Sequence, residues 1–179
     1  KLLNSGFDNG HGYIRMPKRP ASATALAAII LQSSQNDMHG GQSFAFFDKD
    51  MAPFMANATD EEIYQAMEAL IYNLNSMHSR AGAQVPFSSL NIGTDTSDLG
   101  RKVIKNILLA YEKGLGNGEN PIFPNIIFRV KENINLNPGD PNYDLFKLAI
   151  RVAAQRLNPT FSFMDSSFNR PYGDQVGYM

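Results

Sequence analysis

Residues 85–130 read VPFSSLNIGTDTSDLGRKVIKNILLAYEKGLGNGENPIFPNIIFRV, and this stretch decides the fold class. Val85–Leu90 is a short apolar run, which is typical of a buried strand. Ser97 can cap a helix that ends at Gly114. The apolar residues of this helix recur at helical spacing: Leu99, Val103, Ile107 and Tyr111. Ile122–Val130 is nearly continuous in apolar residues and predicts a second strand, so the stretch predicts a strand, a helical crossover and another strand.

The same alternation of helix and strand precedes this unit. Ala21–Leu31 is rich in alanine and leucine and predicts a largely buried helix that ends near Ser33–Ser34. The aromatic run Ser43–Phe47 predicts a strand. Thr59 and Glu62 have the spacing of a capping box, which predicts the start of another helix. The buried stripe of that helix would be Ile63, Met67, Leu70, Leu74 and Met77.

The alternation continues to the end of the chain. Asp140–Pro141 predicts a cap followed by proline in the first helical turn. The buried side of that helix would be Leu145, Leu148, Ala149, Val152 and Leu157. Thr160–Met164 predicts a fourth strand. Buried strands joined by helices predict an α/β fold with a parallel sheet, either open or part of a barrel. Residues 1–179 show no linker or internal repeat, and we treat them as a single segment.

Composition limits the partners and the chemistry. The chain has 179 residues, is 43% apolar and carries a net charge of -1, so its charge predicts no attraction to nucleic acid or to an anionic membrane. No apolar run is long enough to cross a bilayer and the first residues do not resemble a signal peptide, so we expect a cytoplasmic protein. With no cysteine, the chain cannot form disulfides, thiolate zinc sites or a cysteine nucleophile. The histidines at 11, 39 and 78 are too widely spaced for a local metal motif.

The carboxyl ends of the predicted strands are the general place to look for function in parallel α/β folds. They are Asp48–Asp50, Asn91–Ser97, Lys131–Asp140 and Asp165–Asn169. In the second of these, Gly93 and its hydroxyl-bearing neighbours could offer amides and hydroxyls to a phosphate. The alternative, which residue frequencies favour, is that this loop only caps the following helix.

Three other features admit a chemical and a structural interpretation. The acid pairs Asp48/Asp50 and Glu61/Glu62 could be catalytic or bind a metal, but surface capping and solvation are the favoured interpretation. Gly114–Gly118 resembles a phosphate loop, yet it follows a helix and lacks the Lys-Ser/Thr ending, which favours a helix terminator. His78–Arg80 places a possible base beside a hydroxyl only by sequence adjacency, and adjacency does not create a catalytic triad.

The segment Gln35–Gln42 is rich in side chains that both donate and accept hydrogen bonds. Its glycine pair, Gly40 and Gly41, would let the backbone approach a ligand closely. A nucleobase edge would suit such a segment. Composition alone favours a polar turn between a helix and a strand.

Several segments resemble anaerobic, class III ribonucleoside-triphosphate reductases. They are GFDNGHGYIRMPKRP, SSQNDMHGGQS, LNSMHSRAGAQVPFSSLNIGTDTS, GLGNGENPIFPNIIFRVKE, GDPNYDLF and LNPTFSFMDSSFN. Together they span nearly the whole chain in a fixed order. The resemblance implies part of a ten-stranded α/β barrel of the glycyl-radical enzyme type, made of two parallel five-stranded halves. It also implies that the SSQNDMHGGQS segment binds substrate or effector, through Ser34, Gln35, Asn36, His39, Gly40, Gly41 and Gln42.

The family chemistry implied by this resemblance is radical reduction. A glycyl radical, installed by an iron-sulfur activase that uses S-adenosylmethionine, oxidises a cysteine to a thiyl radical. The thiyl radical takes the 3′ hydrogen of a ribonucleoside triphosphate, the 2′ hydroxyl leaves as water, and formate commonly supplies the electrons. The resemblance also implies ATP or deoxyribonucleotide effectors, a structural zinc and a homodimer.

This chain departs from the family pattern in what it contains. It has no cysteine, no C-terminal radical-glycine motif, no four-cysteine zinc site and no ATP cone. We therefore expect a cut segment that is inactive alone and contains no catalytic residue, with the catalytic cysteine beyond Met179. Two alternatives remain at this point: a piece of a pyruvate formate-lyase-like glycyl-radical enzyme, and a non-enzymatic nucleotide-binding module.

Overall fold

Helices and strands alternate along the chain in the computed structural model, which describes residues 2–78 and 81–175. The helices are α1 (Leu2–Ser5), α2 (Pro20–Asp37), α3 (Phe47–Met51), α4 (Asp60–Ser76), α5 (Asp98–Lys113) and α6 (Tyr143–Arg156), with the short 3-10 helices η1 (Ala52–Met55) and η2 (Arg170–Gln175). The strands are β1 (Phe7–Asp8), β2 (Tyr13–Ile14), β3 (Gln42–Phe44), β4 (Ser88–Ile92), β5 (Asn125–Val130) and β6 (Thr160–Phe163).

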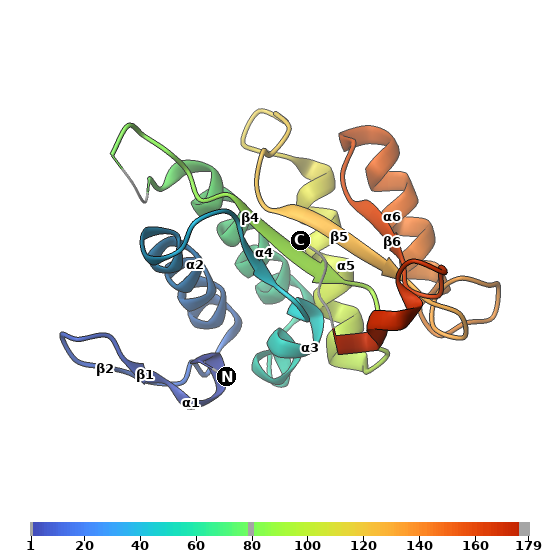
Figure 1. Ribbon diagram of the computed structural model, residues 1–179, viewed down its shortest axis with the longest axis horizontal. Helices are drawn as coiled ribbons and strands as arrows, with labels where there is room; N and C mark the ends of the chain where they lie inside the picture. Colours follow the sequence, from blue (N-terminus) through green and yellow to red (C-terminus); the bar gives the residue numbers. More distant parts are fainter. Residues whose placement is uncertain (1, 79–80, 176–179) are drawn as a thin grey trace.

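The main sheet is parallel and its strands follow in chain order, β3-β4-β5-β6. Helices α2, α4, α5 and α6 run along one face of this sheet, and each packs against the next (Figure 1). The β1–β2 hairpin lies apart from it at the N-terminal side. The α/β fold with parallel strands joined by helices is therefore confirmed.

The two faces of the sheet differ in chemistry. Leu90 pairs with Ile126, and Ile92 pairs with Phe128, and these residues belong to the core under the helices. Because side chains alternate between the faces of a strand, the residues between them point to the opposite face. That face is mostly polar: Ser43, Ser89, Asn91, Arg129 and Ser162.

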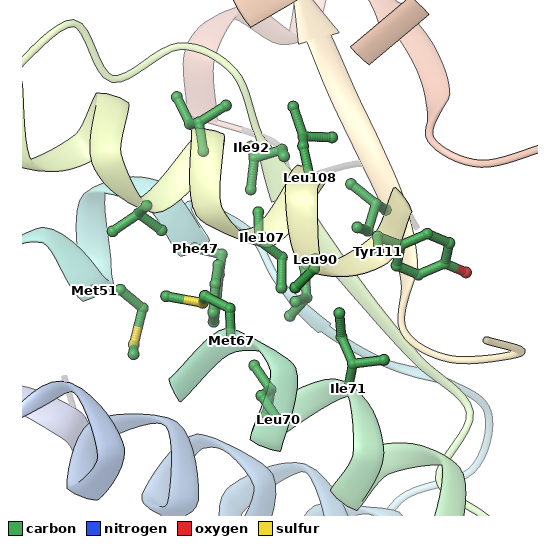
Figure 2. Packing of buried hydrophobic residues seen from close by; sticks show 14 of the residues in the cluster. Phe47, Met51, Met67, Leu70, Ile71, Leu90, Ile92, Ile107, Leu108 and Tyr111 are labelled. Atoms are coloured by element: carbon green, nitrogen blue, oxygen red, sulfur yellow. The ribbon is translucent and has the colours of Figure 1, made fainter. Parts of the chain in front are cut away.

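The core fills the space between the sheet and the helix layer. Figure 2 shows Met67 and Ile71 of α4 and Ile107 of α5 directed toward Leu90 of β4. All are fully buried, and burying each such side chain contributes about 1.5–3 kcal/mol relative to leaving it exposed. Most residues of the apolar stripes predicted for α4 and α5 lie in this core, together with residues of the sheet and of the other helices.

The predicted starts of α4 and α5 and the predicted end of α5 agree with the structure. The capping box of Thr59 and Glu62 and the Ser97 cap are both present, and Gly114 ends α5 as predicted. Helix α2 continues to Asp37, past the predicted end at Ser33–Ser34, because residues 34–37 contain no breaker and Gln35 is buried on the helix.

Helix α6 begins later than predicted. It starts at Tyr143 with Asn142 at the N-cap position, while the carboxylate of Asp140 accepts from the backbone N–H of Asn137. Met77 and Leu157, placed by periodicity in buried stripes, follow the last helical residues and are 53% and 89% exposed.

The strands are shorter or shifted relative to the predictions. Strand β3 ends at Phe44, and Phe47 starts α3 instead, which turns its ring into the core. Strand β4 covers 88–92 instead of 85–90, and β6 ends at Phe163. Strand β5 begins at Asn125, because the side-chain oxygen of Asn75 accepts the backbone N–H groups of Ile122 and Phe123 before the sheet begins.

Candidate functional site

The predicted binding segment Ser34–Gln42 is partly helical. Ser34, Gln35 and Asn36 belong to the last turn of α2, which ends where the backbone N–H of Met38 donates to the oxygen of Ser34. Gln42 is the first residue of β3. Only residues 38–41 connect the two elements, so the exposed part of the segment is short.

Burial divides the segment into anchors and an exposed tip. Gln35 is 1% exposed and Gln42 is 8% exposed, whereas His39 and Gly40 are exposed. Gly41 has a packing reason to be glycine, because a Cβ there would lie 2.5 Å from the ring of Phe87. The side chains exposed at this tip are therefore those of Met38 and His39, and of the two only His39 can both donate and accept hydrogen bonds.

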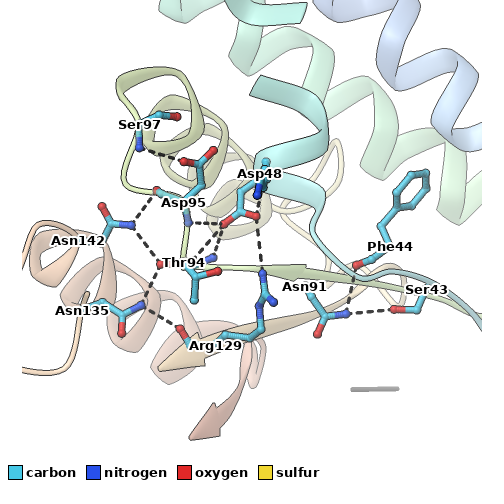
Figure 3. A network of polar contacts seen from close by, with 12 residues as sticks. Ser43, Phe44, Asp48, Asn91, Thr94, Asp95, Ser97, Arg129, Asn135 and Asn142 are labelled. Carbon is cyan, nitrogen blue, oxygen red and sulfur yellow. Dashed lines mark hydrogen bonds and ion pairs between the residues drawn. The ribbon is translucent and has the colours of Figure 1, made fainter. Parts of the chain in front are cut away.

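The carboxyl ends of β3 and β4 are joined by a buried carboxylate. The Oδ2 atom of Asp48 accepts the backbone N–H groups of Gly93, Thr94 and Asp95, at 2.8, 3.2 and 3.2 Å (Figure 3). Its Oδ1 atom lies 3.9 Å from a guanidinium nitrogen of Arg129. Asp48 and Arg129 are 0% and 1% exposed, so the expectation of a solvated surface acid was wrong for Asp48.

This arrangement argues against phosphate binding by the backbone amides of the loop 91–97. The amides that could have bound an external anion are occupied by the protein's own Asp48 carboxylate. Burial raises the pKa of Asp48, while Arg129 and the backbone amides oppose that rise. The helix-capping interpretation is confirmed, since the side chain of Ser97 accepts from the N–H of Gly100.

Two asparagines hold the same loop from the other side. The Nδ2 of Asn135 donates to the carbonyls of Gly93 and Arg129, and the Nδ2 of Asn142 donates to those of Gly93 and Asp95. Gly93 has a φ of +118° and a Cβ there would lie 2.8 Å from the Arg129 carbonyl, so only glycine fits. The loop after β4 is therefore held by three buried side chains: Asp48 of α3, Asn135 after β5 and Asn142 before α6.

A small cavity lies beside this network, and we call it the strand-end pocket. It has a volume of about 250 Å³ and is lined by residues that include Phe46, Lys49, Thr94, Thr96, Arg129 and Lys131. The guanidinium of Arg129 stacks on the ring of Phe46, with its carbon 4.5 Å from the ring centroid. The lining residues lie at or just beyond the carboxyl ends of three neighbouring strands, β3, β4 and β5.

Sequence reasoning missed Asp48, Arg129, Asn135 and Asn142 as parts of one unit. A signal was present for two of them: Asp48 directly follows an aromatic run, and Arg129 interrupts the apolar run of β5. Charged residues at such positions are almost never fully buried unless they are paired. The amide partners could not be predicted because they are backbone groups more than 40 residues away.

The remaining predicted features have structural roles or fall outside the description. Glu62 belongs to the capping box, and Glu61 is exposed beside it. Ser79 and Arg80 of His78–Arg80 lie outside the described residues. Across residues 2–78 and 81–175, no group of three or more His, Asp or Glu could hold a metal ion. In the same residues no helix is both long and apolar enough to span a bilayer.

Comparisons with known sequences all point to one protein family, and they cover most or all of the chain. Residues 1–179 match the family described as anaerobic ribonucleoside-triphosphate reductase. The anaerobic ribonucleoside-triphosphate reductase of Enterobacteria phage T4 is 33% identical, over 88% of this chain and 30% of its own length. That of Escherichia coli is 31% identical, over 96% of this chain and 28% of its own length. The chain thus spans less than a third of the length of these relatives.

A solved structure has a similar fold. The crystal structure of the anaerobic ribonucleotide reductase from Thermotoga maritima in complex with dATP and CTP superposes with a TM-score of 0.63. The alignment covers 92% of this chain and 32% of that chain, at 11% sequence identity. At this identity the likeness concerns the fold.

Proposed function

Because the chain belongs to the anaerobic ribonucleoside-triphosphate reductase family, we propose that it is part of the catalytic barrel of an oxygen-sensitive reductase. That enzyme would convert ribonucleoside triphosphates to deoxyribonucleoside triphosphates by radical chemistry. The proposal rests on the family match across residues 1–179. With no cysteine in the chain, the thiyl radical would have to come from another part of a longer polypeptide.

The two-faced sheet supports a place in a barrel. In an α/β barrel the helices cover the outside and the opposite face of the strands lines the interior. Here the helix layer covers the apolar face, and the other face presents Asn91 and Arg129. A polar barrel interior of this kind suits the binding of a nucleotide substrate better than the packing of a dry apolar core.

We assign the segment Ser34–Gln42 to substrate or effector binding. Its members are Ser34, Gln35, Asn36, His39, Gly40, Gly41 and Gln42. The buried Gln35 and Gln42 would anchor it, and the exposed His39 and Gly40 would respond to the ligand. The segment leads directly into β3, and Asp48 beyond β3 holds the loop after β4. This continuity offers a physical path from the segment to the strand ends.

The cofactors and partners of the enzyme are part of the same proposal. Nucleotide substrates and effectors are supported by the Thermotoga maritima reductase, which was solved with dATP and CTP. We further propose a glycyl radical, an activase that uses S-adenosylmethionine, formate as reductant, a structural zinc, a homodimer and a cytoplasmic location. The chain contains no cysteine, so it supplies neither a thiyl radical nor thiolate ligands for zinc.

The test is anaerobic reconstitution of the complete polypeptide that contains this chain. With its activase, S-adenosylmethionine and formate, it should produce deoxyribonucleotides from ribonucleoside triphosphates, as measured by chromatography. The 179-residue chain alone should produce none, because no sulfur nucleophile is available. Product from the isolated chain, or none from the activated complete protein, would contradict the proposal.

A further inference from the structure

The strand-end pocket has the charge of an anion site. The exposed Lys49 follows β3 and the half-buried Lys131 follows β5, so two lysines line the pocket from the ends of different strands. The third cation, Arg129, faces the buried carboxylate of Asp48. Asp95 also lines the pocket, and the Oδ1 atom of its carboxylate accepts the backbone N–H of Ser97 at the start of α5.

Recognition in this pocket would come from side chains. The amides of residues 93–95 are bound to Asp48, so they cannot also serve an external anion. Thr94 and Thr96 line the pocket together with the two lysines. Ammonium groups and hydroxyls can all donate hydrogen bonds to phosphate oxygens. The volume, about 250 Å³, is below that of typical pockets for drug-sized ligands and suits a phosphate chain better than a whole nucleotide.

We propose that the strand-end pocket binds a polyphosphate anion, of the kind carried by a nucleoside triphosphate, through Lys49, Lys131, Thr94 and Thr96. The anion site stands on the pocket itself; its assignment to a nucleotide rests on the function proposed above. The position agrees with the general rule that ligands of parallel α/β sheets bind beyond the carboxyl ends of the strands. The buried network of Asp48 and Asn135 keeps the Thr94–Thr96 wall in place without occupying the pocket.

Calorimetric titration of the 179-residue chain with sodium tripolyphosphate tests this site. The chain buries its own core, so the measurement does not require the rest of a barrel. We expect saturable binding that weakens with added salt, because both lysines are near solvent. Lys49→Ala and Lys131→Ala should each weaken binding about tenfold, whereas Lys49→Arg should retain it.

Lys113→Ala is the matched control. Lys113 is an exposed lysine at the last residue of α5, whose first turn begins beside the pocket, so it lies about 24 Å away along the helix. Far-UV dichroism should show that all variants keep the wild-type fold. Absence of saturable binding, or equal weakening by Lys113→Ala, would overturn the anion site. Unchanged affinity in both Lys49→Ala and Lys131→Ala would do the same.

Further titrations identify the source of the anion. A ribonucleoside triphosphate, its 2′-deoxy counterpart and inorganic phosphate are compared with tripolyphosphate. Lysine-dependent binding of either nucleotide supports the nucleotide assignment, and a difference between them separates substrate from effector. Tripolyphosphate binding without nucleotide binding would overturn that assignment. The reductase proposal is judged separately by reconstitution: an active complete enzyme with no binding here refutes the pocket alone, and binding here without reductase activity refutes the function alone.

Discussion

The two ends of β3 hold polar residues in opposite ways. At its carboxyl end, Asp48 is buried and binds three consecutive amides of the loop after β4. At its amino end, the Ser34–Gln42 segment is anchored by Gln35 and Gln42, and its tip at His39 is exposed. Both ends are rich in hydrogen-bonding groups. They differ in whether those groups are satisfied by the protein or are accessible to a partner.

This difference suggests different roles for the two ends: the carboxyl end of β3 supports the fold, and the amino end can respond to a ligand. Buried polar groups must be paired, so a network such as that of Asp48, Asn135 and Asn142 has one arrangement of low free energy. An exposed tip between two anchored residues can change conformation at a small cost in free energy. We therefore expect substitutions at the carboxyl end to change stability and substitutions at the tip to change specificity.

The largest expected effect is that of Asp48→Ala. The substitution removes the acceptor for the amides of Gly93, Thr94 and Asp95 and the carboxylate that faces buried Arg129. Breaking a buried charge pair by removing one partner costs about 3–5 kcal/mol. Denaturant unfolding of the chain should show a decrease in the free energy of unfolding of this size.

Asp50→Ala is the control for that experiment. Asp50 lies on the same short helix, α3, and is only half-buried. Its replacement should change the free energy of unfolding by less than about 1 kcal/mol, as is usual away from buried networks. Equal losses in the two variants would mean that the network adds nothing beyond the helix itself.

The scaffold could be predicted from the sequence because it depends on local patterns. Helical stripes, the capping box at Thr59 and the apolar run of β5 each report on neighbouring residues, and they predicted the parallel α/β fold. The ends of elements were less predictable. Phe47 begins α3 and fills the core, although the aromatic run predicted it in a strand. Asn75, on a helix distant in sequence, accepts the backbone N–H groups of Ile122 and Phe123, so β5 begins later than predicted.

The candidate site was predicted only in part. The resemblance to the reductase family pointed to Ser34–Gln42, whose binding role stays a prediction. The same sequence reasoning assigned Asp48 to the surface, because isolated acids are usually solvated. Its burial depends on amides of residues 93–95, and a sequence pattern does not display which backbone groups will face a given side chain.

A smaller effect is expected at the amino end, in the complete enzyme. His39→Ala should remove hydrogen bonds worth about 0.5–1.5 kcal/mol, enough to blur a specificity factor of roughly 10 while turnover survives. His39 is exposed, so its replacement should leave the fold intact. Gln35→Ala should blur specificity similarly, with an added loss of stability because Gln35 is 1% exposed.

The measurement is reduction of the four ribonucleoside triphosphates with each effector in turn. Unchanged effector-dependent base preference in both variants would contradict the role of the segment. A uniform loss toward every substrate in both variants would instead show that His39 and Gln35 only support the barrel.

The smallest expected effect comes from an exposed counterpart of Asp48. Glu62 also binds a backbone amide through its carboxylate, since its Oε2 accepts the N–H of Thr59 at 2.8 Å. In solvent this hydrogen bond lowers the pKa of Glu62, whereas burial raises the pKa of Asp48. A lowered folded-state pKa stabilises the protein above the ordinary glutamate value, about 4.3, and that contribution is lost as the pH falls through the lowered pKa. A raised folded-state pKa has the opposite sign: its contribution is complete at low pH and is lost as the pH rises through the raised pKa.

Denaturant unfolding at pH 7, 5 and 3 should therefore show that Glu62→Gln is destabilising at pH 7 and nearly neutral at pH 3. Glu61→Gln, an exposed neighbour outside the capping box, serves as the control for general charge effects on the first turn of α4. A cost of Glu62→Gln that does not depend on pH would show that the amide of Thr59 contributes no differential stabilisation to the ionised carboxylate.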